Sequence, residues 1–247
     1  MDPWQLVWVT AVFLLAGGVK GVTGMGLPTV AMSLLGLWMT PVQAAALLVV
    51  PSLVTNVAQC RGAHLRPLAV RLWPGWLAIA LVTIAAPGFG GTASTESAER
   101  WLGAILIVYG AWGLWRPTLP DFSGRGPWLG AVAGAATGVV TASTAVFVLP
   151  WVPYLQSLRL SKDEMVQALG LSFTVATLAL LVRVQASAPM GGSSASGAVA
   201  IGSALAGALA GMKFGEAVRG QLAGACFQKA LFGVFIALGA ANLSRAG

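Results

Sequence analysis

The chain has 247 residues, of which 57% are hydrophobic and only 9% are charged. A water-soluble domain of this length needs about 25% charged residues to solvate its surface, so the composition excludes a soluble protein and indicates an integral membrane protein. The net charge of +7 comes from basic residues scattered singly through short polar joints. That distribution is typical of topology signals, so we expect membrane lipid around the chain and no nucleic acid as a partner.

Ten apolar segments follow one another, separated by short polar or Pro/Gly-containing joints. Allowing about 20 residues for a full span and about 15 for a short or broken helix, we place them at 4–19, 22–38, 42–60, 70–87, 100–116, 127–142, 144–158, 164–183, 196–213 and 225–243. These blocks predict an all-α, polytopic transmembrane helical bundle of 8–10 membrane segments. Segments one and two, and segments six and seven, are short and nearly contiguous. Each pair is therefore either two crossings or one re-entrant hairpin of half-helices.

The joint between the first two segments reads GVKGVTGMGLPTV over residues 18–30. Helix breakers at membrane depth release backbone amides, which must then face a protein-lined cavity. Lys20 has two readings: it neutralises an anion inside the membrane, or it marks the cytoplasmic end of the first segment and snorkels to the interface. The substrate-binding candidates in this joint are Lys20, Gly21, Thr23, Gly24, Met25 and Gly26.

The third segment carries a polar stripe at positions i, i+3, i+4 and i+7, formed by Ser52, Thr55, Asn56 and Gln59. This spacing puts the side chains on one helix face, which must look into the bundle and not into lipid. The stripe either lines a cavity or makes ordinary hydrogen bonds between helices. In the eighth segment, the corresponding substrate-binding candidates are Ser172, Thr174 and Thr177.

The two halves of the chain resemble each other in four local matches that keep the same order. Their spacing rises steadily, from 117 residues between Gly21 and Gly138 to 129 between Gly110 and Gly239. We predict a duplication with repeats at 1–118 and 119–247, and an odd number of crossings in each half would invert one copy. Inverted repeats with matching interrupted helices indicate a transporter. The second interruption falls in TGVVTASTAVFVLP, residues 137–150, with candidate residues Thr141, Ser143 and Thr144.

If all ten segments cross, eleven of the fourteen Lys and Arg residues fall in joints on one side. These are Lys20, Arg61, Arg66, Arg71, Arg116, Arg125, Arg159, Lys162, Lys213, Arg219 and Lys229. The positive-inside rule then places both termini outside the cytoplasm.

Several further groups lie at segment ends. Ser161 and Glu164 have the spacing of a capping box, Gln167 is expected to contact that joint, and Arg183 is expected to snorkel outward. No Asp or Glu lies in the middle of an apolar segment, and one histidine and two distant cysteines make no ligand cluster. We therefore predict no enzyme activity, no cofactor and no metal site.

Three stretches of the sequence resemble the sulfite exporter TauE/SafE family of bacterial membrane permeases: GVKGVTGMGLP, LLGLWMTPVQAAALLVVPSLVTNVAQ at 34–59, and VFVLPWVPYLQSLRLSKDEMVQALGLSFTVATLAL at 146–180. The resemblance implies an inner-membrane permease for small anions such as sulfite, thiosulfate, sulfoacetate or related organosulfonates. The chain departs from the usual pattern at Lys20 and at TASTA, where that family typically has TGATG. Our leading hypothesis is a secondary permease that works by alternating access, with the site between the repeats. A passive anion channel is the alternative function. The sequence is compatible with a homo-oligomer.

Overall fold

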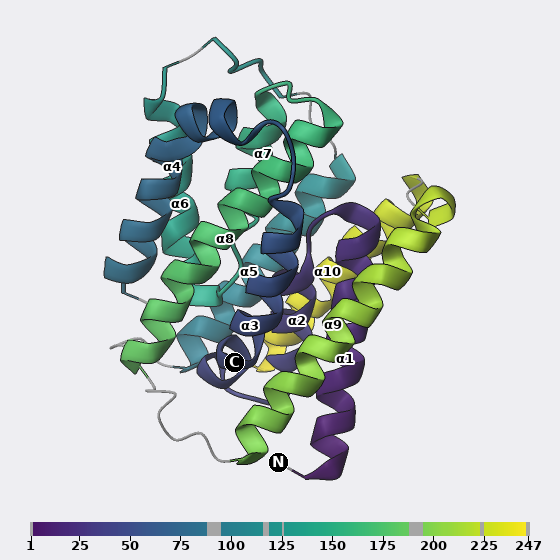
Figure 1. Cartoon of the computed structure of the whole chain (residues 1–247). Coiled ribbons are helices and arrows are strands. Elements are labelled where there is room, and N and C mark those ends of the chain that lie inside the picture. Colours follow the sequence, from purple (N-terminus) through teal and green to yellow (C-terminus); the bar gives the residue numbers. More distant parts are fainter. Residues whose placement is uncertain are drawn as a thin grey trace.

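The computed structural model describes residues 2–87, 95–115, 119–124, 126–187, 195–222 and 225–245. The described residues form ten helices and no strand, which confirms the all-α prediction (Figure 1). The helices are α1 (Pro3–Thr23), α2 (Leu27–Leu35), α3 (Pro41–Gln59), α4 (Leu65–Ala85), α5 (Thr95–Trp115), α6 (Trp128–Thr144), α7 (Trp151–Ser157), α8 (Lys162–Ser187), α9 (Ala195–Leu222) and α10 (Ala225–Arg245).

Six of these helices are long and apolar enough to cross a membrane: α1, α3, α4, α8, α9 and α10. Helix α6 is apolar but has 17 residues, and α5 carries Glu96, Glu99 and Arg100 in its first turns. Helices α2 and α7 have nine and seven residues, so at about 1.5 Å per residue neither spans the hydrocarbon core. Each pair thus joins a helix of 17 or more residues to one of nine or fewer, and its two members are unequal.

Local sequence signals set the helix ends. Thr40 caps α3, accepting a hydrogen bond from the backbone amide of Gln43. At the start of α8, the Ser161 amide donates to Glu164 Oε2 at 2.9 Å, and the Glu164 amide donates to Ser161 Oγ at 3.3 Å. This reciprocal pair confirms the predicted capping box.

The helices pack in pairs that join the two halves of the chain. Helix α1 lies along α9, α4 along α6, and α5 along α10, while α3 faces α8 in the middle of the bundle (Figure 1). Small residues allow the closest approach, because a Cβ at Gly21 would overlap the Met212 carbonyl oxygen and one at Gly134 would overlap that of Gly75.

Two interruptions lie inside the bundle. The first break, residues 24–26, separates α1 from α2, and the second break, residues 145–150, separates α6 from α7. The expected boundary after residue 19 is wrong, because α1 continues through Lys20 and Gly21 and ends at Thr23. Helix α2 is buried except at Leu34, and residues 145–149 are fully buried. The interrupted segments therefore form the core that the long helices enclose.

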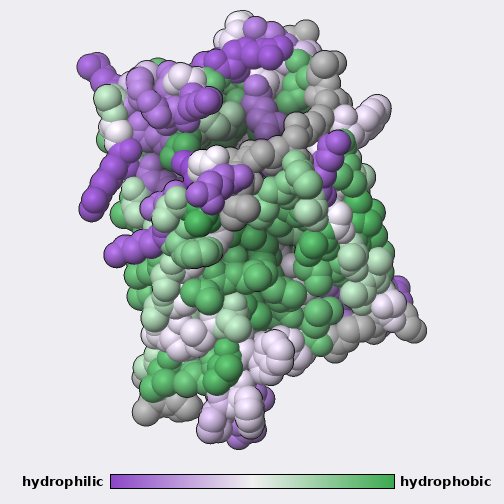
Figure 2. All heavy atoms as spheres, turned by 90° about the vertical axis from the view of Figure 1, so that its right-hand side faces the viewer, coloured by the Kyte–Doolittle hydropathy of each residue, from purple (hydrophilic) through white to green (hydrophobic). Residues whose placement is uncertain are grey.

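The surface separates into a hydrophobic band and a hydrophilic end (Figure 2). The α3–α4 and α7–α8 connections lie at that same end, the upper one in Figure 1. Large apolar side chains such as Val70, Leu81 and Phe214 are exposed around the bundle. This is the surface expected of a protein that sits in lipid.

Candidate functional site

The first break is a tight turn held by side chains from two other helices. Gly24 and Gly26 have φ values of 82° and 98°, which only glycine adopts easily. Gln59 Nε2 on α3 donates to the Gly24 carbonyl at 2.9 Å. Arg219 Nε on α9 donates to the carbonyl of Val22 at 2.9 Å. The turn is therefore fixed: the Gly24 amide still donates to the Lys20 carbonyl at 2.7 Å, and the Gly26 carbonyl accepts from the Val30 amide at 2.9 Å. The Met25 amide instead donates to Thr23 Oγ1 at 3.3 Å.

Lys20 lies in the last two turns of α1 and points into the bundle. Its side chain is 1% exposed, and Nζ donates to Thr55 Oγ1 at 3.1 Å and to Asn56 Oδ1. Asn56 Nδ2 in turn donates to Thr177 Oγ1 at 3.1 Å, so the hydrogen bonds connect α1, α3 and α8. The reading in which Lys20 snorkels to the interface is wrong.

Only neutral side chains solvate this ammonium group. Within the part of the chain that the structure describes, the ion pairs are His64 with Glu164 and Arg100 with Glu96, and neither involves Lys20. A buried ammonium without a counterion is costly, because hydrogen bonds to amide and hydroxyl oxygens compensate only part of its lost hydration. The Lys20 cluster, defined as Lys20, Thr55, Asn56 and Thr177, is therefore a candidate receptor for negative charge.

The polar stripe on α3 faces the bundle interior, as its spacing predicts. Ser52, Thr55 and Asn56 are fully buried, and Gln59 is half-buried. The Ser52 hydroxyl has no hydrogen-bond partner among the described residues. Gln59 Oε1 likewise has no partner among the described residues, so the stripe combines contacts between helices with two unused polar atoms.

The matching residues of α8 make contacts between helices. Ser172 Oγ accepts a hydrogen bond from Trp76 Nε1 at 2.8 Å. Thr174 Oγ1 lies 3.4 Å from Cys60 Sγ, and Thr177 receives the Asn56 amide. Of these three, only Thr177 belongs to the Lys20 cluster.

The second break differs in its chemistry. Thr141 and Thr144 are buried, and their hydroxyls donate to carbonyls one turn earlier, those of Thr137 at 2.8 Å and Val140 at 2.7 Å. Ser143 does the same with the Val139 carbonyl at 3.2 Å. The candidate hydroxyls at the second break therefore all donate within α6.

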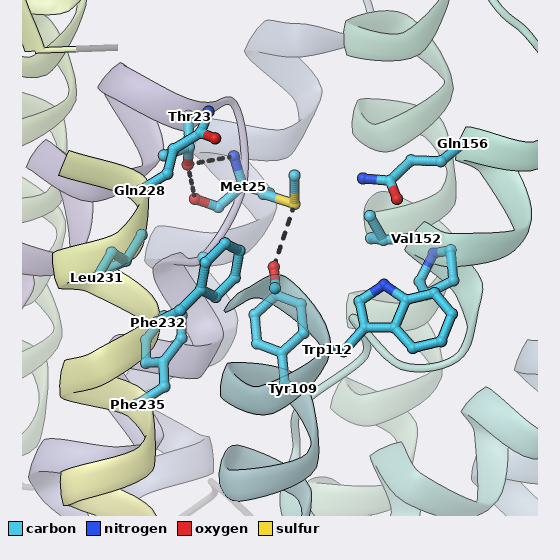
Figure 3. Close-up of a pocket in the computed structure, with 13 residues that line it drawn as sticks. Thr23, Met25, Tyr109, Trp112, Val152, Gln156, Gln228, Leu231, Phe232 and Phe235 are labelled. Carbon is cyan, nitrogen blue, oxygen red and sulfur yellow. Dashed lines mark hydrogen bonds between the residues drawn. The ribbon is translucent and has the colours of Figure 1, made fainter. Parts of the chain in front are cut away.

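A cavity of about 280 Å³ opens beside the first break (Figure 3). We call it the chamber. Helices α5, α7 and α10 provide its other walls, and its lining residues are Thr23, Met25, Gly26, Tyr109, Trp112, Gly113, Val152, Pro153, Gln156, Gln228, Leu231, Phe232 and Phe235. Three predicted candidates thus line it, namely Thr23, Met25 and Gly26. The other candidates lie outside its lining.

Sequence reasoning missed the aromatic and amide residues of the chamber. Tyr109 and Trp112 sit in an apolar stretch of α5, and Phe232 in one of α10, where an aromatic residue gives no sign of facing a cavity. Tyr109 Oη donates to Met25 Sδ at 3.6 Å, which ties α5 to the first break.

Two expected orientations are wrong. Gln167 Nε2 donates to the carbonyls of Cys60 and Gly62 at 2.9 and 3.1 Å, so it caps the end of α3 and does not contact its own joint. Arg183 does not snorkel outward, since it is 8% exposed and Nη1 donates to the carbonyls of Thr83 and Ala86 at the end of α4. Free backbone carbonyls at helix ends attract both side chains.

Comparisons with known proteins identify the family. No curated protein and no solved structure matches the chain. A family model described as sulfite exporter TauE/SafE matches residues 9–242, which include both breaks, the Lys20 cluster and nearly the whole chain. That family comprises membrane permeases for sulfur compounds, which are transporters and not enzymes. The chain therefore belongs to the sulfite exporter TauE/SafE family.

Proposed function

We propose that this chain is a secondary permease for a small sulfur-containing anion, and that Lys20 supplies the positive charge that receives it. The single observation that carries the proposal is the burial of the Lys20 ammonium among neutral partners. An anion that enters the bundle replaces the missing counterion, which offsets the desolvation of both charges. Sulfite, thiosulfate and organosulfonates all meet this requirement.

The first break adds a second favourable feature for an anion. Gly26 lies at the N-terminus of α2, where the first backbone N–H groups have no carbonyl partner in the helix. The helix dipole makes that end positive, so it favours negative charge nearby. Thr23, Gly24 and Met25 lie between this end and Lys20, and we propose all of them as contributors to the substrate path. Gly21 contributes by packing, since it lies against α9.

The helix pairing supports two repeats, 1–118 and 119–247, that work by alternating access. In the proposed repeats, α1 corresponds to α6 and α9 corresponds to α4. The packing of α1 on α9 then has its counterpart in the packing of α6 on α4, and both contacts are present. The contact of Gly17 with Ala208 has its counterpart in that of Gly134 with Gly75. Likewise, Gly103 packs on Gly239, and Gly110 packs on Phe232. The proposed site lies where α3 and α8 meet, between the repeats.

The distribution of joints supports a location in the inner membrane with both termini outside the cytoplasm. The α3–α4 and α7–α8 connections, which hold Arg61 and Arg159, lie at one end of the bundle, while α1 begins and α10 ends toward the other (Figure 1). By the positive-inside rule the first of these ends is cytoplasmic.

Flux measurements in proteoliposomes test the proposal. The purified chain is reconstituted, and entry of sulfite, thiosulfate and small sulfonates is followed with and without an opposing internal anion. We expect anion flux above that of protein-free liposomes, accelerated by substrate on the opposite side, as a carrier requires. Flux without this acceleration would support the passive channel instead, and no flux for any anion in the panel would overturn the proposal.

A further inference from the structure

Gln167, near the start of α8, holds the end of α3. Its Nε2 donates to the carbonyls of Cys60 and Gly62 at 2.9 and 3.1 Å, and its Oε1 accepts a hydrogen bond from the His64 amide at 3.0 Å. The side chain is 2% exposed, so both halves of a buried amide group are used. We call these contacts the Gln167 clamp. They join α8, in the second half of the chain, to the α3–α4 connection at the hydrophilic end of the bundle (Figure 1).

Arg183, near the other end of α8, holds the end of α4 in a similar way. Its Nη1 donates to the carbonyls of Thr83, Ile84 and Ala86 at 3.0, 3.3 and 2.7 Å. Because α4 starts at the hydrophilic end and has 21 residues, these carbonyls lie at the opposite end of the bundle (Figure 1). We call these contacts the Arg183 clamp. Both clamps use the same chemistry, since the last carbonyls of a helix have no amide partner within it.

The Lys20 cluster lies between the two clamps. Thr177, its member on α8, follows Gln167 by ten residues and precedes Arg183 by six, which is about 15 Å and about 9 Å along the helix. Every residue of the cluster is at most 1% exposed, so this conformation closes the cluster toward both ends of the bundle. An anion reaches Lys20 only when one end opens, and alternating access requires the other end to stay closed meanwhile.

Hydrogen bonds to carbonyls at a helix end suit a contact that must open and close. When such a contact separates, water can hydrate the donor and the carbonyls, so opening exchanges hydrogen bonds and does not simply lose them. The two clamps also act on different helices, because one holds α3 and the other holds α4. One clamp can therefore separate while the other remains in place.

We propose that Gln167 and Arg183 are the two gate-positioning residues of the permease. Each holds α8 against the first half of the chain at one end of the bundle, and release of one clamp at a time opens the Lys20 cluster to one face of the membrane. This proposal rests on the proposed function, because it assigns the barriers on the two sides of the same site.

Thiol labelling from one face of the membrane at a time tests the proposal. Cys60 is half-buried and lies on the Gln167 side of Asn56 along α3. Ser52→Cys places a second reporter thiol one turn to the other side of Asn56. The exposed Cys226 is replaced by serine in both reporter chains, and Cys60 is replaced as well in the second. A membrane-impermeant maleimide is applied to inside-out and to right-side-out vesicles, and the labelling rates are compared.

The two clamp variants should act on opposite faces. Gln167→Met should raise the rate of Cys60 labelling from one face about tenfold and leave labelling of the Ser52→Cys reporter from the other face within about twofold. Arg183→Met should do the reverse. Ser161→Ala removes the cap of α8 but neither clamp, so this control should change neither rate. Should Arg183→Met fail to fold, Arg183→Lys, which keeps the charge but loses the guanidinium fork, should give a smaller change from the same face.

The outcomes separate the two proposals. Increases from the same face for both variants, or increases from both faces alike, would show a merely structural role and overturn the gates. Unchanged labelling in both variants of a chain that transports would also overturn the gates and leave the permease intact. Absence of flux for every anion in the panel would overturn the proposed function itself.

Discussion

The first break and the second break, which the proposed duplication would place at matching positions in the two halves, are built from different chemistry. The first break is a glycine turn that Gln59 and Arg219 hold by its carbonyls, and it lines the chamber. The second break has no glycine and consists of a buried, non-helical apolar stretch, in which Phe147 packs on Phe173 with ring centroids 4.9 Å apart. One break exposes polar groups to a cavity, and the other fills the core.

This difference teaches that the two halves, which we propose to be repeats, do not carry equivalent sites. The spacing of 117 residues that relates Gly21 to Gly138 also relates Lys20 to Thr137. Thr137 is buried, and its hydroxyl donates to the Ala133 carbonyl of its own helix at 2.8 Å. The positive charge therefore exists on one side of the proposed site only. We expect the first half to bind the anion and the second half mainly to support the helices around it.

Removing the charge should have the largest effect. Lys20→Met keeps the length and apolar stem of the side chain but loses the ammonium, so we expect anion flux to fall about 100-fold, because a hydrogen bond to a charged group contributes up to about 3 kcal/mol. The matched variant Thr137→Val should change flux by less than about twofold. Rates in proteoliposomes, normalised to reconstituted protein, provide the measurement. Equal losses in both variants would show that the halves contribute alike.

The second largest effect is expected on stability, where alanine substitutions at Gly21 and Gly138, the glycines that precede the two breaks, should differ. A Cβ at Gly21 meets backbone atoms of Met212, Gly215 and Glu216, which cannot move alone, whereas a Cβ at Gly138 first meets the Val82 side chain. We expect Gly21→Ala to destabilise the protein by about 3 kcal/mol and Gly138→Ala by about 1 kcal/mol. Thermal unfolding in detergent compares the two midpoints. A lower midpoint for the Gly138 variant would contradict the closer packing of α1 on α9.

The turn residues themselves should show the smallest effect. Gly24→Ala places a side chain at φ 82° and should cost about 1 kcal/mol. Ala145 already has φ 55°, so Ala145→Gly relieves strain but adds freedom to the unfolded chain and should be nearly neutral. The same unfolding assay detects the difference. If Ala145→Gly destabilised more than Gly24→Ala, the first break would not depend on its glycine.

Local patterns predicted much of the fold, and distant partners explain what they missed. The ten segments, the Ser161–Glu164 cap and the inward stripe on α3 follow from periodicity and capping rules. The continuation of α1 through Gly21 does not, because the Met212 carbonyl that favours a glycine there lies far along the chain. The same holds for Lys20, whose orientation depends on Thr55 and Asn56.

The chamber escaped prediction for a related reason. Its walls come from four regions of the chain, and its aromatic residues are indistinguishable in sequence from those that face lipid. Trp112 lines the cavity while Trp101 and Trp115, on the same helix, are exposed. Only the packing of α5 against α10 determines which of these side chains turns inward.

The central claim is that the Lys20 ammonium lacks a fixed counterion so that the transported anion can provide it. Asn56→Asp tests this most directly, because it places a carboxylate of nearly the same shape against Nζ. The account predicts that sulfur-anion flux falls at least about tenfold, since the carboxylate neutralises Lys20 and repels the substrate, while the thermal unfolding midpoint stays equal or rises. A folded Asn56→Asp variant that transports at the unmodified rate would contradict the account.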